Sequence, residues 1–284
     1  MQEVYLITGS AGFIGSNLIR YLMYSEKNHI IGVDKIKTTT SMHNVYFNKS
    51  HDFFIGDVTD YNFISKMFLL FKPSKVICLS SSESISEEIC GLENLIKCSN
   101  GSKLVYVSNT NVYKDNKKNN EDSIVFPKTH ESAKKICAES LILSSKTPYT
   151  IFRASEVFGP RQFFGFIPDI CRSFDAGSIV LDNESKVRDL LYVEDLCNAI
   201  HMFSKEEFSE IYNISINNDF TDLEIISMTD KQLKIINNNK IFNNFEIDTN
   251  KIKEKGWKPL RKFRDQIKFT FKWFENNKWA LSDY

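Results

Sequence analysis

The stretch LITGSAGFIGSN, residues 6–17, decides the fold, because it sets three glycines between an apolar run and a segment with helical periodicity. This order predicts a strand, a tight turn and a helix. Gly9 suits the sharp turn, Gly12 allows the backbone to approach a pyrophosphate, and Gly15 lets the helix pack closely on the sheet. The pattern therefore predicts a dinucleotide site, with the pyrophosphate at the N-terminus of the helix, where free amides and the helix dipole favour an anion.

A carboxylate at the end of the second apolar run supports the same site. Asp34 ends the run at 30–34 and lies 19 residues after Gly15. At this spacing a carboxylate accepts hydrogen bonds from the hydroxyls of an adenosine ribose and repels the additional phosphate of NADP. The sequence therefore favours NAD over NADP, although the neighbouring Lys35 could attract that phosphate.

Short apolar runs alternate with helical segments through the first two-thirds of the chain, which predicts an α/β fold with a Rossmann-type, doubly wound parallel sheet. We expect strands at 4–8, 30–34, 52–55, 76–79, 104–108 and 149–153, and helices at 14–24, 61–71, 87–98 and 131–143. The pattern is irregular after Pro160, where we expect strands at 178–181 and 211–214, helices at 193–203 and 263–276, and a solvated connection at 235–245. These patterns predict an NAD-binding domain at 1–160 and a smaller substrate-binding lobe at 161–284, with an exchange of segments between them left open.

Composition excludes several functional classes. Lys and Arg together number 36, as do Asp and Glu, so no net charge attracts nucleic acid or an anionic membrane. The six cysteines form no CxxC pair and do not cluster with the five histidines, so we expect no metal site, no disulfide framework and a cytoplasmic location. No basic segment precedes the first apolar run and no run reaches about 18 residues, so we expect neither a cleaved leader nor a membrane span.

Further motifs follow the glycine loop in order. They are GDVTD at 56–60, RASEVFGPRQ at 153–162, VRDLLYVED at 187–195, DTNK at 248–251 and KGWKP at 255–259. With the glycine loop, and over nearly the whole chain, they resemble the extended short-chain dehydrogenase/reductase family, within it the NAD-dependent epimerases and dehydratases that act on nucleotide sugars. The last two motifs resemble those of the sugar-nucleotide 4,6-dehydratases.

The resemblance implies NAD as cofactor and a nucleotide sugar as substrate. Asp57 would bind the adenine edge, and Lys134 the nicotinamide ribose. The residues assigned to the cofactor are Gly9, Gly12, Phe13, Ile14, Gly15, Asp34, Asp57, Val58 and Lys134.

On the substrate side, the resemblance makes Arg188 a charge-assisted clamp on a phosphate. The alternative is a surface arginine paired with Asp189 or Glu184. Glu156 stands where relatives have an asparagine near the phosphates, which is unfavourable unless Arg161 or Arg188 neutralises it.

The catalytic positions depart from the family pattern. The family uses Ser/Thr, Tyr and Lys, with Tyr and Lys four residues apart on one helix face. In THESAKK at 129–135, Lys134 keeps the lysine position and His130 takes that of the tyrosine. In SNTNVY at 108–113, Asn109, Thr110 and Asn111 replace the family's Thr, Asp and Glu, and Glu88 stands where relatives have an asparagine. The candidate catalytic residues are Lys134, His130, Asn109 and Tyr113.

These departures distinguish between reactions. A 4,6-dehydration needs an acid and a base that Thr110 and Asn111 cannot supply near neutral pH. A 4-keto reduction or 4-epimerisation of a UDP- or dTDP-hexose needs one proton donor or acceptor, a role open to His130, although its side chain is about 2 Å shorter than that of tyrosine. The alternative is an inactive NAD-binding relative that serves as a regulatory or structural partner.

The helix at 131–143 carries small and apolar residues at helical spacing, namely Ala133, Ile136, Cys137, Ser140 and Leu141. This face and the resemblance predict a homodimer through a four-helix interface. The alternative is that the face packs on the sheet of its own chain.

Overall fold

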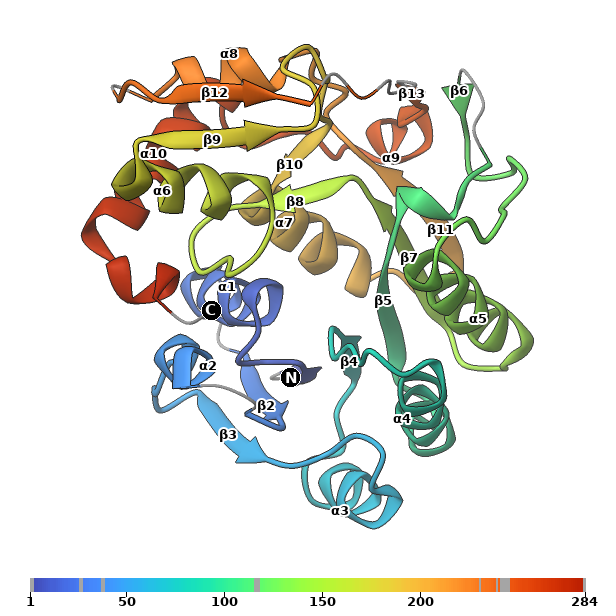
Figure 1. Ribbon diagram of the computed structural model, residues 1–284. Coiled ribbons are helices and arrows are strands. Elements are labelled where there is room, and N and C mark those ends of the chain that lie inside the picture. Colours follow the sequence, from blue (N-terminus) through green and yellow to red (C-terminus); the bar gives the residue numbers. More distant parts are fainter. Residues whose placement is uncertain are drawn as a thin grey trace.

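The computed structural model describes residues 3–282 except 26–27, 37–38, 115–117, 230, 239 and 241–245. Its central feature is a seven-stranded sheet in the order β11-β7-β5-β4-β1-β2-β3 (Figure 1). The strands are β1 (Val4–Thr8), β2 (His29–Asp34), β3 (His51–Ile55), β4 (Lys75–Cys78), β5 (Lys103–Asn109), β7 (Tyr149–Ala154) and β11 (Glu210–Ile214). All neighbouring pairs run parallel, which confirms the predicted Rossmann-type sheet.

The strand order reverses between β1 and β4. From β1 the sheet grows through β2 to β3 on one side, and from β4 through β5 and β7 to β11 on the other. Thr8 and Cys78 pair at the carboxyl ends of β1 and β4. Ligands of open parallel sheets bind in the crevice outside the carboxyl ends at such a reversal, so the topology itself marks this edge as the site.

Helices cover both faces of the sheet. On one face α1 (Phe13–Ser25) packs against α7 (Val193–Ser204), and on the other α3 (Tyr61–Phe71), α4 (Ile85–Cys98) and α5 (His130–Ser144) lie side by side (Figure 1). Each face has its own apolar cluster, the first including Leu18 and Ile200, the second Ile64, Leu92 and Ala138. Burial of these clusters supplies the main favourable contribution to folding.

Side-chain caps fix where the helices nearest the site begin. Asp60, Ser84 and Thr129 accept hydrogen bonds from amides in the first turns of α3, α4 and α5. Such caps stabilise a helix by about 1 kcal/mol each. The first turn of α4, which carries Glu88, and that of α5, which carries His130, are therefore held in defined positions.

The remaining elements lie mainly beyond residue 154. In the described residues, pairs of parallel strands are formed by β8 (Glu156–Phe158) with β10 (Leu190–Tyr192), β9 (Ser178–Leu181) with β12 (Lys234–Asn237), and β6 (Lys118–Asn119) with β13 (Glu246–Ile247). The other helices are α2 (Thr39–Asn44), η1 (Thr110–Val112), α6 (Phe166–Ala176), α8 (Asp222–Ser227), α9 (Asn250–Glu254), α10 (Phe263–Asn276) and η2 (Lys278–Leu281).

The prediction of a solvated connection at 235–245 is wrong for the first residues of that range. Ile235 to Asn237 belong to β12, which pairs with β9, because Ile235 packs against the large apolar cluster. Residues 239 and 241–245 lie outside the described part of the chain.

The strand predicted at 211–214 is β11, and it joins the large sheet. Ile211 pairs with Ile151 of β7, so the sheet includes a strand from beyond residue 160. The division of the chain at 160 stays a prediction. Across the described residues, no helix has the length and apolar character that crossing a membrane requires.

Candidate functional site

The glycine loop makes the tight turn that the sequence predicts. Gly9 has φ +67°, and a Cβ built on it would lie 2.5 Å from the carbonyl oxygen of Leu79. A Cβ on Gly15 would lie 2.2 Å from the carbonyl oxygen of Gly9. Neither position accepts a side chain without backbone movement, and the turn directs the first amides of α1 toward the carboxyl edge of the sheet.

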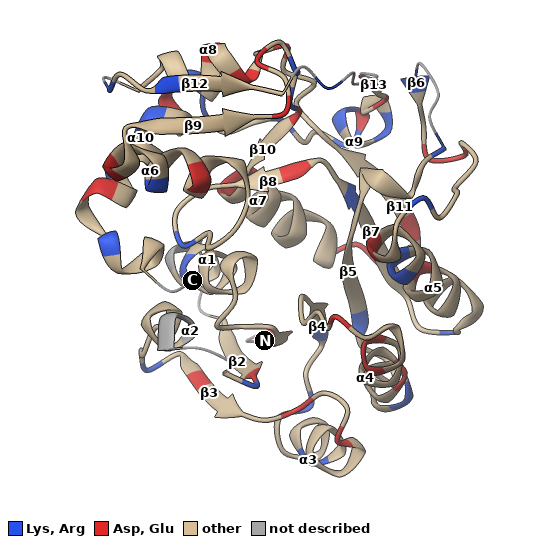
Figure 2. Cartoon of the chain, in the orientation of Figure 1, with Lys and Arg blue, Asp and Glu red and all other residues tan. Residues whose placement is uncertain are grey.

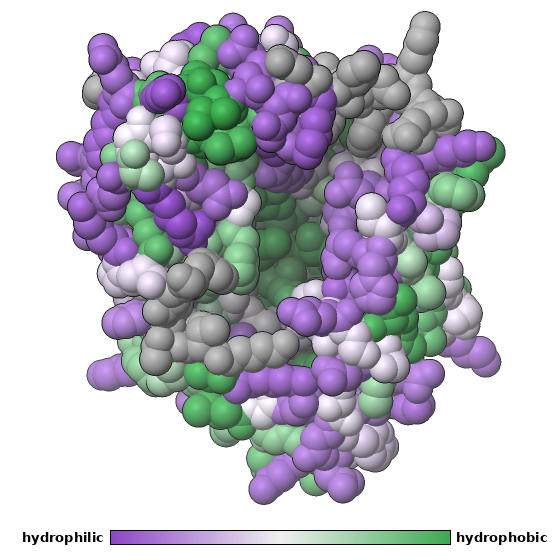
Figure 3. Space-filling view, in the orientation of Figure 1, coloured by the Kyte–Doolittle hydropathy of each residue, from purple (hydrophilic) through white to green (hydrophobic). Residues whose placement is uncertain are grey.

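A cavity of about 480 Å³ lies at this edge, within the range of small-molecule sites. In the space-filling view the molecule is hollowed near its centre, with apolar side chains on the floor (Figure 3). The residues that line the cavity are Gly9, Gly12, Phe13, Val33, Asp34, Lys35, Gly56, Val58, Thr59, Leu79, Ser80, Ser81, Ser82, Glu87, Glu88, Gln162, Phe163, Phe164 and Ala280. Of the predicted cofactor residues this set includes Gly9, Gly12, Phe13, Asp34 and Val58.

Asp34 is oriented by two backbone amides. Its Oδ2 accepts from the amide of Ala11 at 2.9 Å, and its Oδ1 accepts from the amide of Ile36 at 3.0 Å. A carboxylate has about four acceptor sites, so both oxygens can still accept from ribose hydroxyls. The carboxylate is thereby held at the wall of the cavity, at the end of β2.

The side chain of Lys35 is held by carboxylates. Its Nζ lies 2.7 Å from Oδ2 of Asp57 and 3.8 Å from Glu87. Although burial opposes the shift, the hydrogen bonds from Lys35 and Thr59 hold the pKa of Asp57 below its usual value. One ammonium thus faces two carboxylates, which leaves little attraction for the extra phosphate of NADP.

These features fit a dinucleotide. At the glycine loop, any Cβ on Gly9 would fill the space beside Leu79. The carboxylate of Asp34 faces the cavity, which runs along the edge of β1, β2 and β4. Ile14, Gly15, Asp57 and Lys134 are not among the residues that line it.

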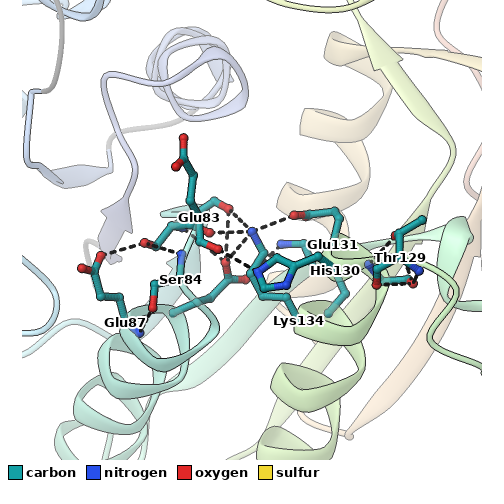
Figure 4. A network of polar contacts seen from close by, with 12 residues as sticks. Glu83, Ser84, Glu87, Thr129, His130, Glu131 and Lys134 are labelled. Atoms are coloured by element: carbon teal, nitrogen blue, oxygen red, sulfur yellow. Dashed lines mark hydrogen bonds and ion pairs between the residues drawn. The ribbon is translucent and has the colours of Figure 1, made fainter.

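Lys134 lies behind the wall of this cavity, in the network of Figure 4. Its Nζ is 2.6 Å from the carbonyl oxygen of Ser82, 2.7 Å from Glu131 Oε2, and 3.3 Å from both Ser81 Oγ and Glu88 Oε2. Burial lowers the pKa of Lys134, but the two carboxylates outweigh burial and raise it above its usual value. Lys134 is therefore a charged group whose three N–H donors all have oxygen partners.

Glu88 is the buried counter-ion of this network. Its side chain is 3% exposed, and its other oxygen accepts from the Tyr106 hydroxyl at 2.9 Å and from Lys135 Nζ at 3.2 Å. Burial raises the pKa of Glu88, but the charges of Lys135 and Lys134 outweigh burial and hold this pKa below its usual value. Sequence reasoning found the substitution at Glu88 but missed the pairing with Lys135, one residue past the lysine position. Figure 2 shows residues of both charges on α4 and α5, where this network lies.

His130 begins α5 and is exposed. Its Nε2 lies 3.0 Å from the carbonyl oxygen of Glu83, in the loop between β4 and α4 (Figure 4). One helical turn separates it from Lys134, as the sequence predicts for the pair. The structure thus brings His130 and Lys134 together beside the loop that carries Ser81 and Ser82, two residues of the cavity wall.

Tyr113 and Asn109 are engaged elsewhere. The Tyr113 side chain is buried, and its hydroxyl donates to Asn213 Oδ1 at 2.6 Å and accepts from Arg153 at 3.0 Å. Asn109 Oδ1 accepts from the amide of Asn111 at 3.1 Å and so caps η1. Their catalytic roles stay predictions, and the hydroxyl of Tyr113 belongs to a buried polar cluster.

Arg188 pairs with Glu156, one of the partners considered from the sequence, and with Asp222, which the sequence did not indicate. Its Nε and Nη2 donate to Asp222 at 2.6 and 3.2 Å, and its Nη1 donates to Glu156 at 3.2 Å. The guanidinium lies 4.0 Å from the centre of the Phe166 ring. Arg188 therefore neutralises Glu156, whereas the Arg161 guanidinium lies over the Trp273 ring at 5.4 Å.

Comparison with known proteins places the chain among relatives of the same architecture. The model of the NAD dependent epimerase/dehydratase family matches residues 5–215. The chain belongs to this family. NAD is therefore the cofactor expected from family membership, and the glycine cradle, Asp34 and the cavity fit it.

Two curated relatives match nearly the full chain. A low-salt glycan biosynthesis protein of Haloferax volcanii is 27% identical, over 92% of this chain and 95% of its own. The dTDP-glucose 4,6-dehydratase of Salmonella typhimurium is 24% identical, over 97% of this chain and 94% of its own.

Solved structures have the same fold. The dTDP-glucose 4,6-dehydratase of Bacillus anthracis in complex with NAD superposes with a TM-score of 0.87 at 23% identity, over 98% of both chains. The UDP-glucose 4-epimerase of Thermotoga maritima with UDP-glucose superposes with a TM-score of 0.82 at 21% identity, over 97% of this chain and 99% of its own.

Proposed function

We propose that the protein is an NAD-dependent enzyme that acts on a nucleotide sugar, as a 4-keto reductase or 4-epimerase of a UDP- or dTDP-hexose. The observation that supports it is the position of His130 and Lys134, one helical turn apart beside Ser81 and Ser82 of the cavity wall. Relatives named as dTDP-glucose dehydratases and UDP-glucose epimerases support the substrate class. Bound NAD would supply the hydride acceptor or donor.

In this proposal the side chains divide the remaining tasks. His130 exchanges a proton with the sugar hydroxyl through Nε2, the atom that now contacts the carbonyl of Glu83. Lys134 holds the ribose and keeps a positive charge near the imidazole. Dehydration is disfavoured, because Thr110 is buried and Asn111 has no titratable group to act as acid or base.

A specific observation favours a second candidate, an NAD-binding relative without catalysis that serves as a regulatory or structural partner. Every N–H donor of Lys134 has an oxygen partner, and two of these partners, Glu88 and Glu131, are carboxylates. The hydroxyl of Tyr113, the other candidate proton donor, is held by Arg153 and Asn213. Hydride chemistry would require Lys134 to leave part of this network.

One experiment separates the two candidates. The purified protein, saturated with NAD, is mixed with UDP-glucose, UDP-galactose and dTDP-glucose, and bound NADH is followed by absorbance while sugar products are followed by chromatography. The reductase direction is tested with NADH and a 4-keto hexose nucleotide. Bound NADH or a changed sugar supports the enzyme. NAD binding with no hydride transfer to or from any of these sugars supports the second candidate.

We also propose a homodimer through α4 and α5. These helices pack side by side in one chain, and Cys137 and Ser140 are exposed on α5. A small exposed residue permits close helix approach, so Ser140→Arg should shift the protein toward a monomer. Sedimentation at micromolar concentration tests this, and a monomeric wild type would favour the packing of α5 within its own chain alone.

A further inference from the structure

The far end of the chain reaches the cofactor cavity. Ala280 lines the cavity together with the glycine loop, although some 270 residues separate it from Gly9. It lies in η2 and is only 2% exposed. Phe13, in the first turn of α1, lines the same cavity, and Figure 1 shows α1 directly after the glycine loop. The cavity therefore has a wall that comes from the C-terminal turn, which no cofactor motif of the sequence indicates.

An aromatic contact holds this turn against the cofactor side of the molecule. The Trp279 ring lies 4.9 Å, centre to centre, from the ring of His43 in α2. On its other side Trp279 packs edge to face with Trp273 of α10 at 5.7 Å. Trp279 thus bridges α2, which follows the strand that ends at Asp34, and the last long helix of the chain.

A second segment covers the cavity from the same direction. Phe163 and Phe164 line the cavity just before α6, and Phe164 is 65% exposed although it contributes to the wall. Gly165, with φ +102°, follows them and begins the turn into α6. Both phenylalanines thus belong to the wall against which a ligand in this cavity would lie.

Arg172 of α6 joins the two covering segments. Its Nε donates to the carbonyl oxygen of Leu281 at 3.3 Å, and its Nη2 donates to the carbonyl oxygen of Phe163 at 2.5 Å. Its Nη1 donates to Asp169, one turn earlier on the same helix, at 3.1 Å. One planar guanidinium therefore connects the C-terminal turn at Leu281 to the segment at Phe163.

We propose that the C-terminal turn, residues 278–282, is a cofactor-binding element that closes over bound NAD together with Phe163 and Phe164, and that Arg172 is the positioning residue that links them. Release of NAD then requires Trp279 to leave His43 and the turn to open. The proposal concerns the cofactor site alone, so it stands or falls independently of the sugar reaction.

Deletion of the turn tests the proposal directly. A chain that ends at Asn277 is compared with a control that ends at Ser282, which keeps the whole turn. Both are saturated with NADH and mixed with excess NAD in a stopped-flow instrument. We expect the shorter chain to release NADH about tenfold faster and the control to match the wild type. Equal release rates from two folded variants overturn the proposal.

Point substitutions keep the test decisive if the deletion prevents folding. Trp279→Ala should speed NADH release several-fold, and Arg172→Lys, which retains the charge but loses the fork of donors, should speed it less. Ala280→Phe should fill the cavity wall and weaken NADH binding at least tenfold. If Ala280→Phe folds and binds NADH as the wild type does, Ala280 is not part of the cofactor site and the proposal fails.

Trp279 also provides a signal that a purely structural turn would not give. Energy transfer to bound NADH from Trp279 and its neighbour Trp273 should quench tryptophan fluorescence. The double variant Trp273→Phe/Trp279→Phe should remove most of this quenching while Trp257→Phe removes little, since Trp257 is buried against Asp195 of α7. Quenching that persists in the double variant places NADH away from the turn and contradicts the proposal.

Discussion

Replacement of Glu88 by glutamine should destabilise the protein through the buried network between α4 and α5. Among the described residues the carboxylate has five polar partners, each of which donates to it, namely Tyr106 Oη, Lys135 Nζ, Lys134 Nζ, Ser81 Oγ and the Ser82 amide. A glutamine amide turned either way sets its own NH₂ against donors. Two lysine ammonium groups, 4% and 12% exposed, lose a counter-charge at the same time.

The loss of one partner from a buried ion pair typically costs about 3 to 5 kcal/mol, and we expect about 3 kcal/mol here because Glu131 still faces Lys134. For a chain of 284 residues that corresponds to a melting temperature lower by about 5 °C at pH 7. The pKa of Glu88 is lowered in the folded protein, so its contribution is present above its ordinary value of 4.5 and is lost as the pH falls through the folded value. The difference between wild type and variant should therefore narrow below pH 4.5.

Calorimetry between pH 4 and pH 8 measures both effects. As a matched control, Lys135→Met in the Glu88→Gln background removes one of the two charges that Glu88 balances and should recover part of the lost stability. A melting temperature that falls by less than about 2 °C, or a second substitution that lowers it further, would refute the assignment of Glu88 as the counter-ion of these lysines.

Three further predictions concern ligands. Asp57→Asn should release Lys35 and so raise the affinity for NADPH relative to that for NADH about tenfold, as measured by fluorescence titration. An unchanged ratio of the two affinities would contradict the role of the ion pair between Lys35 and Asp57. His130→Tyr should raise or create hydride transfer and Lys134→Ala should weaken NADH binding. If the wild type is active and His130→Tyr abolishes its activity, His130 is instead the proton-transfer group. If Lys134→Ala binds NADH as the wild type does, the active-site helix is misassigned. Glu156→Gln should remove a carboxylate that competes with UDP for Arg188, and UDP should then bind about fivefold more tightly, as measured by calorimetry. Weaker binding of UDP would instead indicate that Glu156 orients Arg188.

Local signals explain why so much of the fold could be predicted. Apolar runs such as 4–8 and the periodic segment at 61–71 match β1 and α3 in full, because their burial patterns repeat with the period of the element itself. The connection at 235–245 was predicted wrongly in part, because its Asn and Lys content hides the pairing of β12 with β9, a contact between segments about 55 residues apart.

The cofactor and catalytic positions also differ in how far apart in the sequence the interacting residues lie. Gly9 and Asp34 lie in one β-α-β unit, so their spacing carries the geometry of the site. The environment of Lys134 depends on Glu88, and that of Arg188 on Asp222, both of which lie more than 30 residues away. No periodicity links such partners, and Ala280 reaches the cavity from the opposite end of the chain.

The position of β11 at the margin of the large sheet affects how the protein can be divided or synthesised. A fragment that ends at residue 160 would lack β11 and leave one edge of β7 unpaired along Thr150 to Ala154, while the other edge keeps its pairing with β5. This segment is almost wholly buried in the intact chain, and an apolar strand edge without a partner is a site of aggregation. During synthesis on the ribosome, the same edge stays open until some fifty further residues have emerged, so this protein depends on late chain segments to close a sheet that begins with its fourth residue.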